Sequence, residues 1–100
     1  MQELVDDDRA ELSYRSSLGC IENNLGEVLD SLHRPEEAAE MYDRAIESQQ
    51  FCCQRAPQVA EFREFLGRHY DNDRRVLAAL GRWDDYLEVT RAEFELANQQ

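Results

Sequence analysis

Apolar residues first recur at helical spacing between residues 18 and 32. Steps of three and four place them on one side of a helix, as in an amphipathic helix. The members are Leu18, Ile21, Leu25, Val28, Leu29 and Leu32. The pattern stops at His33-Arg34, so the sequence predicts a helix that ends there.

A second helix is predicted from Pro35 to about residues 53–54. Proline suits the first turn of a helix, because its missing N–H has no partner at that place. Two glutamates follow it, where the helix dipole favours negative charge. The apolar face is Ala38, Met41, Tyr42, Ala45 and Ile46. Pro57 then predicts a boundary near Ala56.

The chain contains an internal repeat. The segment YRSSLGCIENN at 14–24 aligns with FREFLGRHYDN at 62–72, an offset of 48. Further along, DRAIE at 43–47 resembles TRAEF at 90–94, which implies that one residue has been lost there. The matches at offset 48 include Tyr14 with Phe62, Leu18 with Leu66, Gly19 with Gly67, Asn24 with Asn72, and Val28, Leu29 and Leu32 with Val76, Leu77 and Leu80. Since so many matches share one offset, we interpret them as a duplication.

The second copy repeats the plan of the first. Its first helix is predicted from Phe62 to Leu80, and Gly81 can end it in the left-handed conformation. His33 holds the equivalent place in copy one. On the last helix, the residues expected to face inward are Trp83, Tyr86, Leu87 and Phe94.

The charge of the chain limits its partners. It carries 22 acidic and 11 basic residues, a formal charge of −11. Nucleic-acid binding needs clustered Lys and Arg, so nucleic acid and anionic membranes are not expected partners, whereas a basic or mixed-charge protein is. The alternative is that the charge only keeps the domain soluble. No apolar run reaches the length that a membrane span needs.

The sequence contains no set of residues for catalysis, cofactor binding or metal binding. Three cysteines do not form a disulfide framework and favour a reducing, cytoplasmic compartment. Adjacent Cys52 and Cys53 are expected to point in different directions, one into the core and one outward. His33 and His69 are isolated from further metal ligands in the sequence, and no glycine-rich phosphate loop is present. We therefore expect no enzyme activity, no cofactor and no metal.

These residues together resemble the tetratricopeptide repeat (TPR) family. Leu25-Gly26, Leu29, Ala38, Tyr42 and Ala45 occupy the places of the TPR pattern in order. The run NNLGEVLDSLHRPEEAAEMYDRAIE is similar to long-period members, such as kinesin light chain repeats and arrays attached to bacterial serine/threonine kinases. The resemblance covers about residues 14–96.

The resemblance implies an all-α fold of four helices in two TPR-like antiparallel pairs, a fragment of an α-solenoid or superhelix. The whole chain, 1–100, would be a single domain, with repeat one at about 9–54 and repeat two at about 58–98. Small residues at Gly26, Ala38 and Ala45 would let the helices of copy one approach closely.

Copy two departs from the TPR pattern. Arg74 stands in the place of Gly26 and Tyr86 in the place of Ala38, so a wider helix crossing is expected. Asp73 interrupts the apolar pattern in the place of Leu25. Because an unpaired buried carboxylate is costly, we expect Asp73 to be partly exposed or paired with an arginine. Copy two would be a capping unit, or it would contact another subunit.

The same resemblance implies that the first helix of each pair lines a groove for a peptide. Asparagines there would bond the peptide backbone through paired donors and acceptors, and Arg68 with Arg75 would hold an acidic side chain or a C-terminal carboxylate. The candidate site residues are Asn23, Asn24, Glu27, Arg68, Asn72 and Arg75. The alternatives are that the asparagines bond locally and that the arginines belong to a surface salt-bridge network.

The functional hypothesis is a non-catalytic protein-interaction module that binds a peptide or protein segment in this groove. The alternative is a structural or oligomerisation fragment of a longer repeat array in a bacterial signalling protein such as a serine/threonine kinase. Stacked repeats normally need about three units to bury a core, and two are present here, so a homo-oligomer could supply the missing interface.

Overall fold

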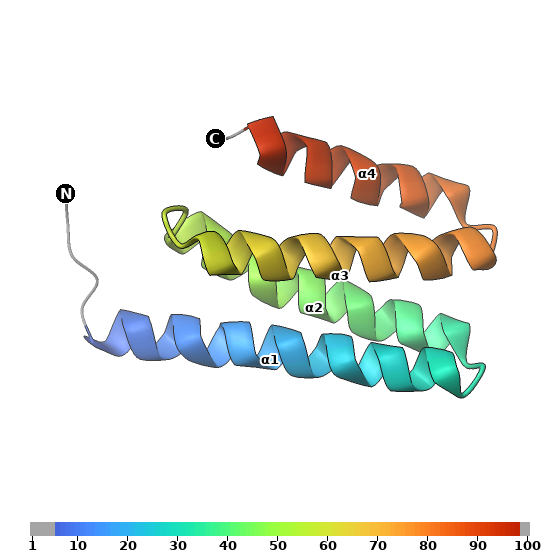
Figure 1. Cartoon of the computed structure of the whole chain (residues 1–100), viewed down its shortest axis with the longest axis horizontal. Helices are drawn as coiled ribbons and strands as arrows, with labels where there is room; N and C mark the ends of the chain where they lie inside the picture. Colours follow the sequence, from blue (N-terminus) through green and yellow to red (C-terminus); the bar gives the residue numbers. More distant parts are fainter. Residues whose placement is uncertain (1–5, 99–100) are drawn as a thin grey trace.

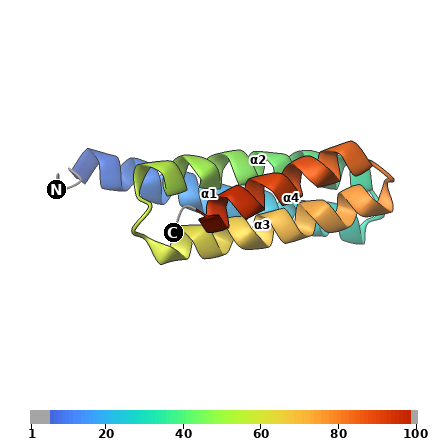
Figure 2. The same ribbon diagram turned by 90° about the horizontal axis from the view of Figure 1, so that it is seen from above.

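The computed structural model describes residues 6–98 and shows four helices in that range. They are α1 (Asp6–Ser31), α2 (Pro35–Arg55), α3 (Ala60–Ala79) and α4 (Trp83–Asn98). Successive helices run in opposite directions and stand in a row from α1 to α4 (Figure 1). The Cα atoms span 44 × 27 × 15 Å, so the molecule is a flat slab of helices, also seen from above in Figure 2. The all-α class and the four predicted helices are confirmed. The ends of the predicted domain, residues 1–5 and 99–100, lie outside the described part.

The turns within the two helix pairs have the same structure. His33 has φ of 60° and Gly81 has φ of 71°, both in the left-handed region. In each turn the next N–H donates to a carbonyl five residues back, Arg34 to Leu29 and Arg82 to Leu77, both at 2.9 Å. Such bonds satisfy carbonyls that a helix end leaves free. The left-handed residues are therefore confirmed at both predicted places.

The repeat keeps its offset of 48 as far as the start of the last helix, since the two turns are equally long and α2 and α4 begin 48 residues apart. Farther along α4, the half-buried Val89 and Ala92 lie 47 residues after the buried Tyr42 and Ala45 of α2. This agrees with the lost residue inferred from DRAIE and TRAEF. The break predicted near Ala56 is confirmed, since α2 ends at Arg55 and α3 begins at Ala60.

Small residues bring α1 and α2 into close contact. Ala38 and Ala45 are fully buried, and the ring of Tyr42 lies directly over Gly26. A Cβ atom added to Gly26 would lie 2.5 Å from Cε1 of that ring. Gly19 is equally constrained, because its Cβ would lie 2.9 Å from the side-chain oxygen of Gln49. The small residues predicted to permit close approach do so.

The seam between α3 and α4 is wider, as predicted. A Cβ added to Gly67, the counterpart of Gly19, would meet no atom within 4 Å. Arg74 spans the seam and pairs at 2.6 Å with both Glu93 of α4 and Asp71 of its own helix. None of the α4 residues is fully buried. A long charged side chain thus replaces the glycine contact of copy one.

The apolar pattern of α1 faces mostly outward, contrary to the usual reading of such a pattern. Apart from Leu12, the side of α1 that contacts its neighbours is small or polar, and comprises Ser16, Gly19, Asn23 and Gly26. By contrast, Ile21 is 62% exposed and Leu32 is 59% exposed. The pattern predicted the helix correctly but not the face that packs.

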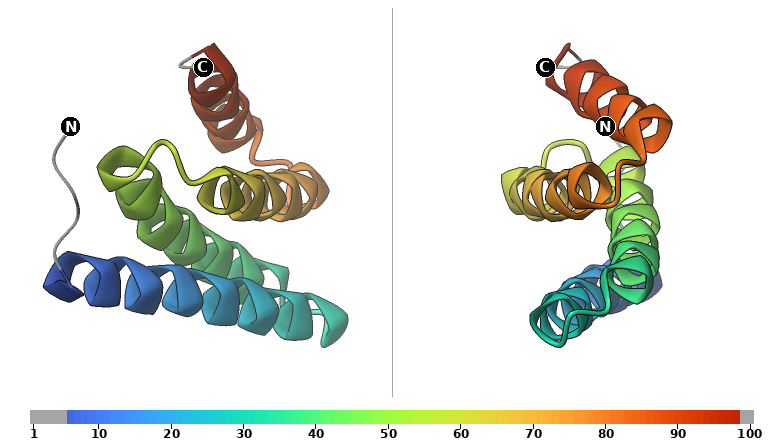
Figure 3. Two further views of the ribbon diagram at one scale, coloured as in Figure 1. Left: turned by 60° about the vertical axis from the view of Figure 1, so that its left-hand side comes forward. Right: turned by 90° about the vertical axis from the view of Figure 1, so that its right-hand side faces the viewer.

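The expectation for α4 is wrong in a similar way. Trp83, Leu87 and Phe94, expected to face inward, are 57%, 58% and 67% exposed. Tyr86 is half-buried and packs toward the core at Ala38 and Leu77. The inward side of α4 instead includes Val89, Ala92 and Leu96. The physical reason is that α4 has only one neighbouring helix to cover it, since the row of helices ends there (Figure 3).

Asp73 also differs from its prediction. It is fully buried, and neither carboxylate oxygen has a hydrogen-bond partner. No ion pair reaches it within residues 6–98, although Arg82 acts on it by charge. Burial, and after it the neighbouring carboxylate of Asp43, raise the pKa of Asp73 to about 9. The side chain is therefore neutral at pH 7, which is how an unpaired buried carboxylate is tolerated.

A buried chain of hydrogen bonds connects three helices. Gln49 of α2 is fully buried, and its Nε2 donates to Ser16 Oγ of α1 at 3.0 Å. Its Oε1 lies 3.2 Å from Nε2 of His69 on α3. Burial, and secondarily the charge of Arg68, lower the pKa of His69 to about 4, so the ring is neutral at pH 7. Its Nε2 must carry the hydrogen, because Gln49 Oε1 can only accept.

We expect Gln49→Leu to lower the free energy of unfolding by about 2 kcal/mol, because it leaves both Ser16 and His69 without their buried partner. The measurement is urea denaturation followed by circular dichroism. Gln54→Leu is the matched control, since Gln54 is an exposed residue of the same helix, and it should change stability by less than about 0.5 kcal/mol. Equal effects of the two substitutions would show that the chain of hydrogen bonds contributes nothing.

Candidate functional site

The first helices of the two pairs form a groove. α1 and α3 run in the same direction and lie near each other, with α2 behind them (Figures 1 and 3). Hydrogen bonds and an ion pair place Asn23, Asn72 and Arg75 on this side. We call it the α1–α3 groove and describe it from its middle outward.

The middle of the groove is closed by two of the predicted asparagines. Asn72 of α3 donates through Nδ2 to Oδ1 of Asn23 on α1 at 3.0 Å. Asn23 is only 7% exposed. Asn72 also accepts a hydrogen bond from Arg75 at 3.2 Å. The local bonding proposed as an alternative therefore exists for these two residues, and it joins α1 to α3.

Arg75 extends this bridge toward the far end of the groove. Its Nη2 lies 3.3 Å from Oδ2 of Asp30 on α1, and both side chains are more than one third exposed. An ion pair of this kind contributes less than about 1 kcal/mol to stability. It nevertheless occupies the guanidinium that was predicted to hold a ligand carboxylate.

The remaining candidates, Asn24, Glu27 and Arg68, are exposed. The guanidinium carbon of Arg68 lies 5.8 Å from the ring centre of Phe65, and its charge acts on Cys20 of α1. Among the described side chains, those of residues 8–98, Arg68 makes no ion pair. That these three residues contact a ligand stays a prediction.

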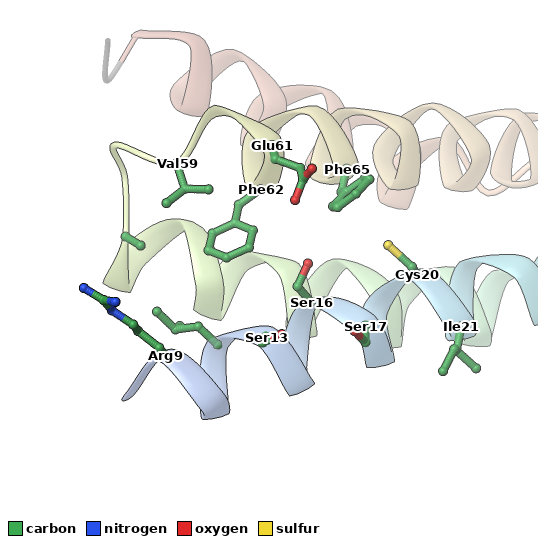
Figure 4. A pocket seen from close by; sticks show the side chains of 12 residues that line it. Arg9, Ser13, Ser16, Ser17, Cys20, Ile21, Val59, Glu61, Phe62 and Phe65 are labelled. Atoms are coloured by element: carbon green, nitrogen blue, oxygen red, sulfur yellow. The ribbon is translucent and has the colours of Figure 1, made fainter. Parts of the chain in front are cut away.

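A cavity opens at the other end of the groove, where α1 and α3 start. Its volume is about 670 Å³, in the range of small-molecule and side-chain pockets. Phe62 projects from α3 toward α1, while Ser16 and Cys20 project from α1 toward α3 (Figure 4). The lining is mostly apolar and includes Leu12, Ala56, Val59, Phe62 and Phe65, with Arg9 and Glu61 at the rim.

None of the residues that line the cavity is among the six candidate site residues predicted from the sequence. Phe62 was interpreted only as the start of the first helix of copy two. The available signal was the spacing of Phe62 and Phe65, which are three residues apart and therefore lie on one side of α3 near its start. Two large rings side by side need neighbouring residues to cover them, and the sequence offers no obvious ones.

The cysteines are packed thiols. Burial raises the pKa of Cys20 and of Cys52, and raises that of Cys53 to about 11, so all three stay protonated at neutral pH. Cys52 Sγ lies 3.4 Å from the carbonyl oxygen of Leu12, to which it donates. The prediction that one of Cys52 and Cys53 is exposed is wrong, because both are buried. Adjacent residues of α2 can both be buried since α1 covers one side and α3 the next.

Two findings concern other kinds of site. Over residues 6–98, no three side chains of His, Cys, Asp or Glu converge in a way that could hold a metal ion. In the same range, no helix is both long enough and apolar enough to cross a membrane.

Comparison with protein-family models, with curated proteins and with solved structures finds no match for this chain. The groove itself is therefore the feature that indicates a function.

Proposed function

We propose that the chain is a non-catalytic, TPR-like protein-interaction module that binds a peptide segment in the α1–α3 groove. The observation that carries the proposal is the cavity of about 670 Å³ at the end of this groove. An apolar lining with a polar rim is typical of a site that accepts an apolar anchor residue. The ligand class is thus a peptide with a large apolar side chain.

Charge supports a particular kind of peptide. The chain carries a formal charge of −11, which attracts basic segments over a distance. Arg68 makes no ion pair among the described side chains, and its charge acts on Cys20 of the cavity, so it can contact a ligand carboxylate there. We therefore expect a mixed-charge peptide, with its apolar residue in the cavity and an acidic group near Arg68.

The test is selection of a binding peptide from a random 12-residue display library, followed by titration of the synthetic peptide. Ser17→Phe places a ring in the cavity and should weaken binding at least about tenfold, which corresponds to 1.4 kcal/mol. Ser31→Phe is the matched control, since it makes the same change on the same exposed side of α1 but away from the cavity.

The outcomes are distinct. If no peptide is enriched, the proposed function is wrong. If Ser17→Phe and Ser31→Phe bind the peptide as well as the wild type, the cavity is not the site. The double variant Asn24→Ala and Asn72→Ala then asks whether the asparagines contribute, and unchanged affinity removes them as ligand contacts.

A further inference from the structure

The side of α1 that faces away from α2 carries a continuous apolar stripe. Five of its members are large side chains exposed by 45–66%, and Leu18 is partly exposed. They recur at alternating steps of four and three, so they lie on one line along the helix. The outer stripe of α1 consists of Tyr14, Leu18, Ile21, Leu25, Val28 and Leu32. Contiguous exposed apolar surface of this kind marks an interaction site.

The opposite end of the row carries a second stripe. Trp83, Leu87 and Phe94 of α4 lie on one side of the helix and are all more than half exposed. We call them the outer stripe of α4. The two stripes are at the two ends of the molecule, α1 and α4 (Figure 3).

The internal repeat shows what the outer stripe of α1 corresponds to. At the offset of 48, its six positions align with Phe62, Leu66, His69, Asp73, Val76 and Leu80 of copy two. These are the residues through which α3 packs on α2. Leu66 contacts the cluster of Ile46 and Cys53, and Val76 contacts the cluster of Ala39 and Tyr42.

α4 is the counterpart of α2, because it is the second helix of copy two. α2 packs on the first helix of the next pair through Ala39 and Ile46. Within the described residues no such helix follows α4, and its outer stripe stays exposed. The described residues thus contain one complete α2–α3 junction and, in α1 and α4, a first and a second helix that each lack the corresponding neighbour.

From this correspondence we infer that a second copy of the chain docks its α4 outer stripe on the α1 outer stripe, in the way that α2 docks on α3. The contact joins two different faces, so it is head-to-tail and leaves each complex with a free stripe at either end. It uses the ends of the row, and Ile21 is the one residue of the α1 stripe that also lines the cavity of the α1–α3 groove. The inference rests on the two stripes and not on the proposed function.

Electrostatic repulsion opposes this contact. Each copy carries a formal charge of −11, so association should strengthen when salt screens the charges. Burial of the apolar stripes drives the contact, at about 25 cal/mol for each Å² removed from water. We therefore expect measurable association at about 0.5 M salt, where the screening length is only a few Å.

The test is analytical ultracentrifugation of the 100-residue chain and of two variants, Leu25→Glu and Leu87→Glu. Wild type should show an average mass that rises with concentration beyond that of a dimer. Each variant retains one intact stripe and should be monomeric alone. An equimolar mixture should form a 1:1 complex that grows no further, because the intact α4 of the first variant fits the intact α1 of the second.

Ala79→Glu is the matched control, since it adds the same charge at an exposed apolar residue outside both stripes. It should associate as the wild type does. Circular dichroism establishes that every variant is folded. The inference is overturned if the wild type stays monomeric at high salt, if the mixture of folded variants stays monomeric, or if Leu87→Glu alone still dimerises, which would indicate contact between two α1 stripes.

Discussion

Asp73→Asn is expected to raise the free energy of unfolding by about 4 kcal/mol at pH 7. In the folded chain burial, and after it Asp43, raise the pKa of this carboxyl to about 9 from its ordinary value of 3.8. Folding at pH 7 therefore requires the uptake of a proton, and each pH unit between the ordinary pKa and pH 7 costs about 1.4 kcal/mol. An asparagine is neutral in both states and avoids this cost.

The pH dependence gives the sharper test. Because the folded pKa of Asp73 is raised, its contribution to stability is complete below pH 4 and is lost as the pH rises toward 9. His69 acts in the opposite sense, since its lowered pKa of about 4 removes stability as the pH falls below 6.5. The two slopes cancel between about pH 4 and 6.5, and only that of Asp73 remains above this range.

The wild type should therefore lose about 2 kcal/mol between pH 6.5 and 8, whereas Asp73→Asn should lose almost nothing. Urea denaturation at several pH values measures both curves. Glu64→Gln, on an exposed carboxylate of the same helix, is the control and should follow the wild type. Parallel curves for Asp73→Asn and wild type would refute the assignment of a neutral Asp73.

Gly26→Ala is expected to be strongly destabilising, whereas Gly67→Ala is expected to be stabilising. The new Cβ at Gly26 would lie 2.5 Å from the fully buried ring of Tyr42, so α1 and α2 would have to separate. Overpacking of this kind costs about 1–3 kcal/mol. At Gly67 there is no atom within 4 Å, so alanine only improves helix propensity, by about 0.5–1 kcal/mol.

Thermal denaturation measures this pair. A change of 1 kcal/mol shifts the Tm of a domain of this size by about 4–8 °C, so the two variants should differ by about 10 °C or more. A Gly26→Ala variant with an unchanged Tm would contradict the close contact. The double variant Gly26→Ala with Tyr42→Leu should lose much less from the alanine than Gly26→Ala does alone, because the clashing ring is absent.

The sequence predicts the helices well because their signals are local. Pro35, Gly81 and Pro57 each act on their own stretch of backbone, and the small residues at Gly26, Ala38 and Ala45 act across one seam. The repeat offset of 48, read from the sequence, is kept by the structure from the first helix to the start of the last.

The packing face of the outer helices could not be predicted in the same way. α1 has two usable faces, and its close-packed one is built from glycine, serine and asparagine, which a hydrophobicity pattern does not identify. Which face is covered depends on how many helices stand on either side, and this is not a local property. The same reason explains the errors at Trp83, Leu87 and Phe94.

The cavity and the state of Asp73 are also products of tertiary structure. The cavity lies between α1 and α3 and is lined by residues of both helices, on one side of the hydrogen bond that joins Asn23 to Asn72. For Asp73, the sequence shows the cost of burial but not that Asp43 comes close to it. Neither feature is contained in the spacing of residues along one helix.

The loose attachment of α4 has a consequence for folding cooperativity. α4 buries no residue fully, whereas the hydrogen bonds of Gln49 hold α1, α2 and α3 together. The amide hydrogens of α4 should therefore exchange with solvent through a partial opening that leaves the other three helices intact. A neighbour bound over Trp83 and Leu87 would suppress this opening, so each added copy would also complete the folding of the one before it.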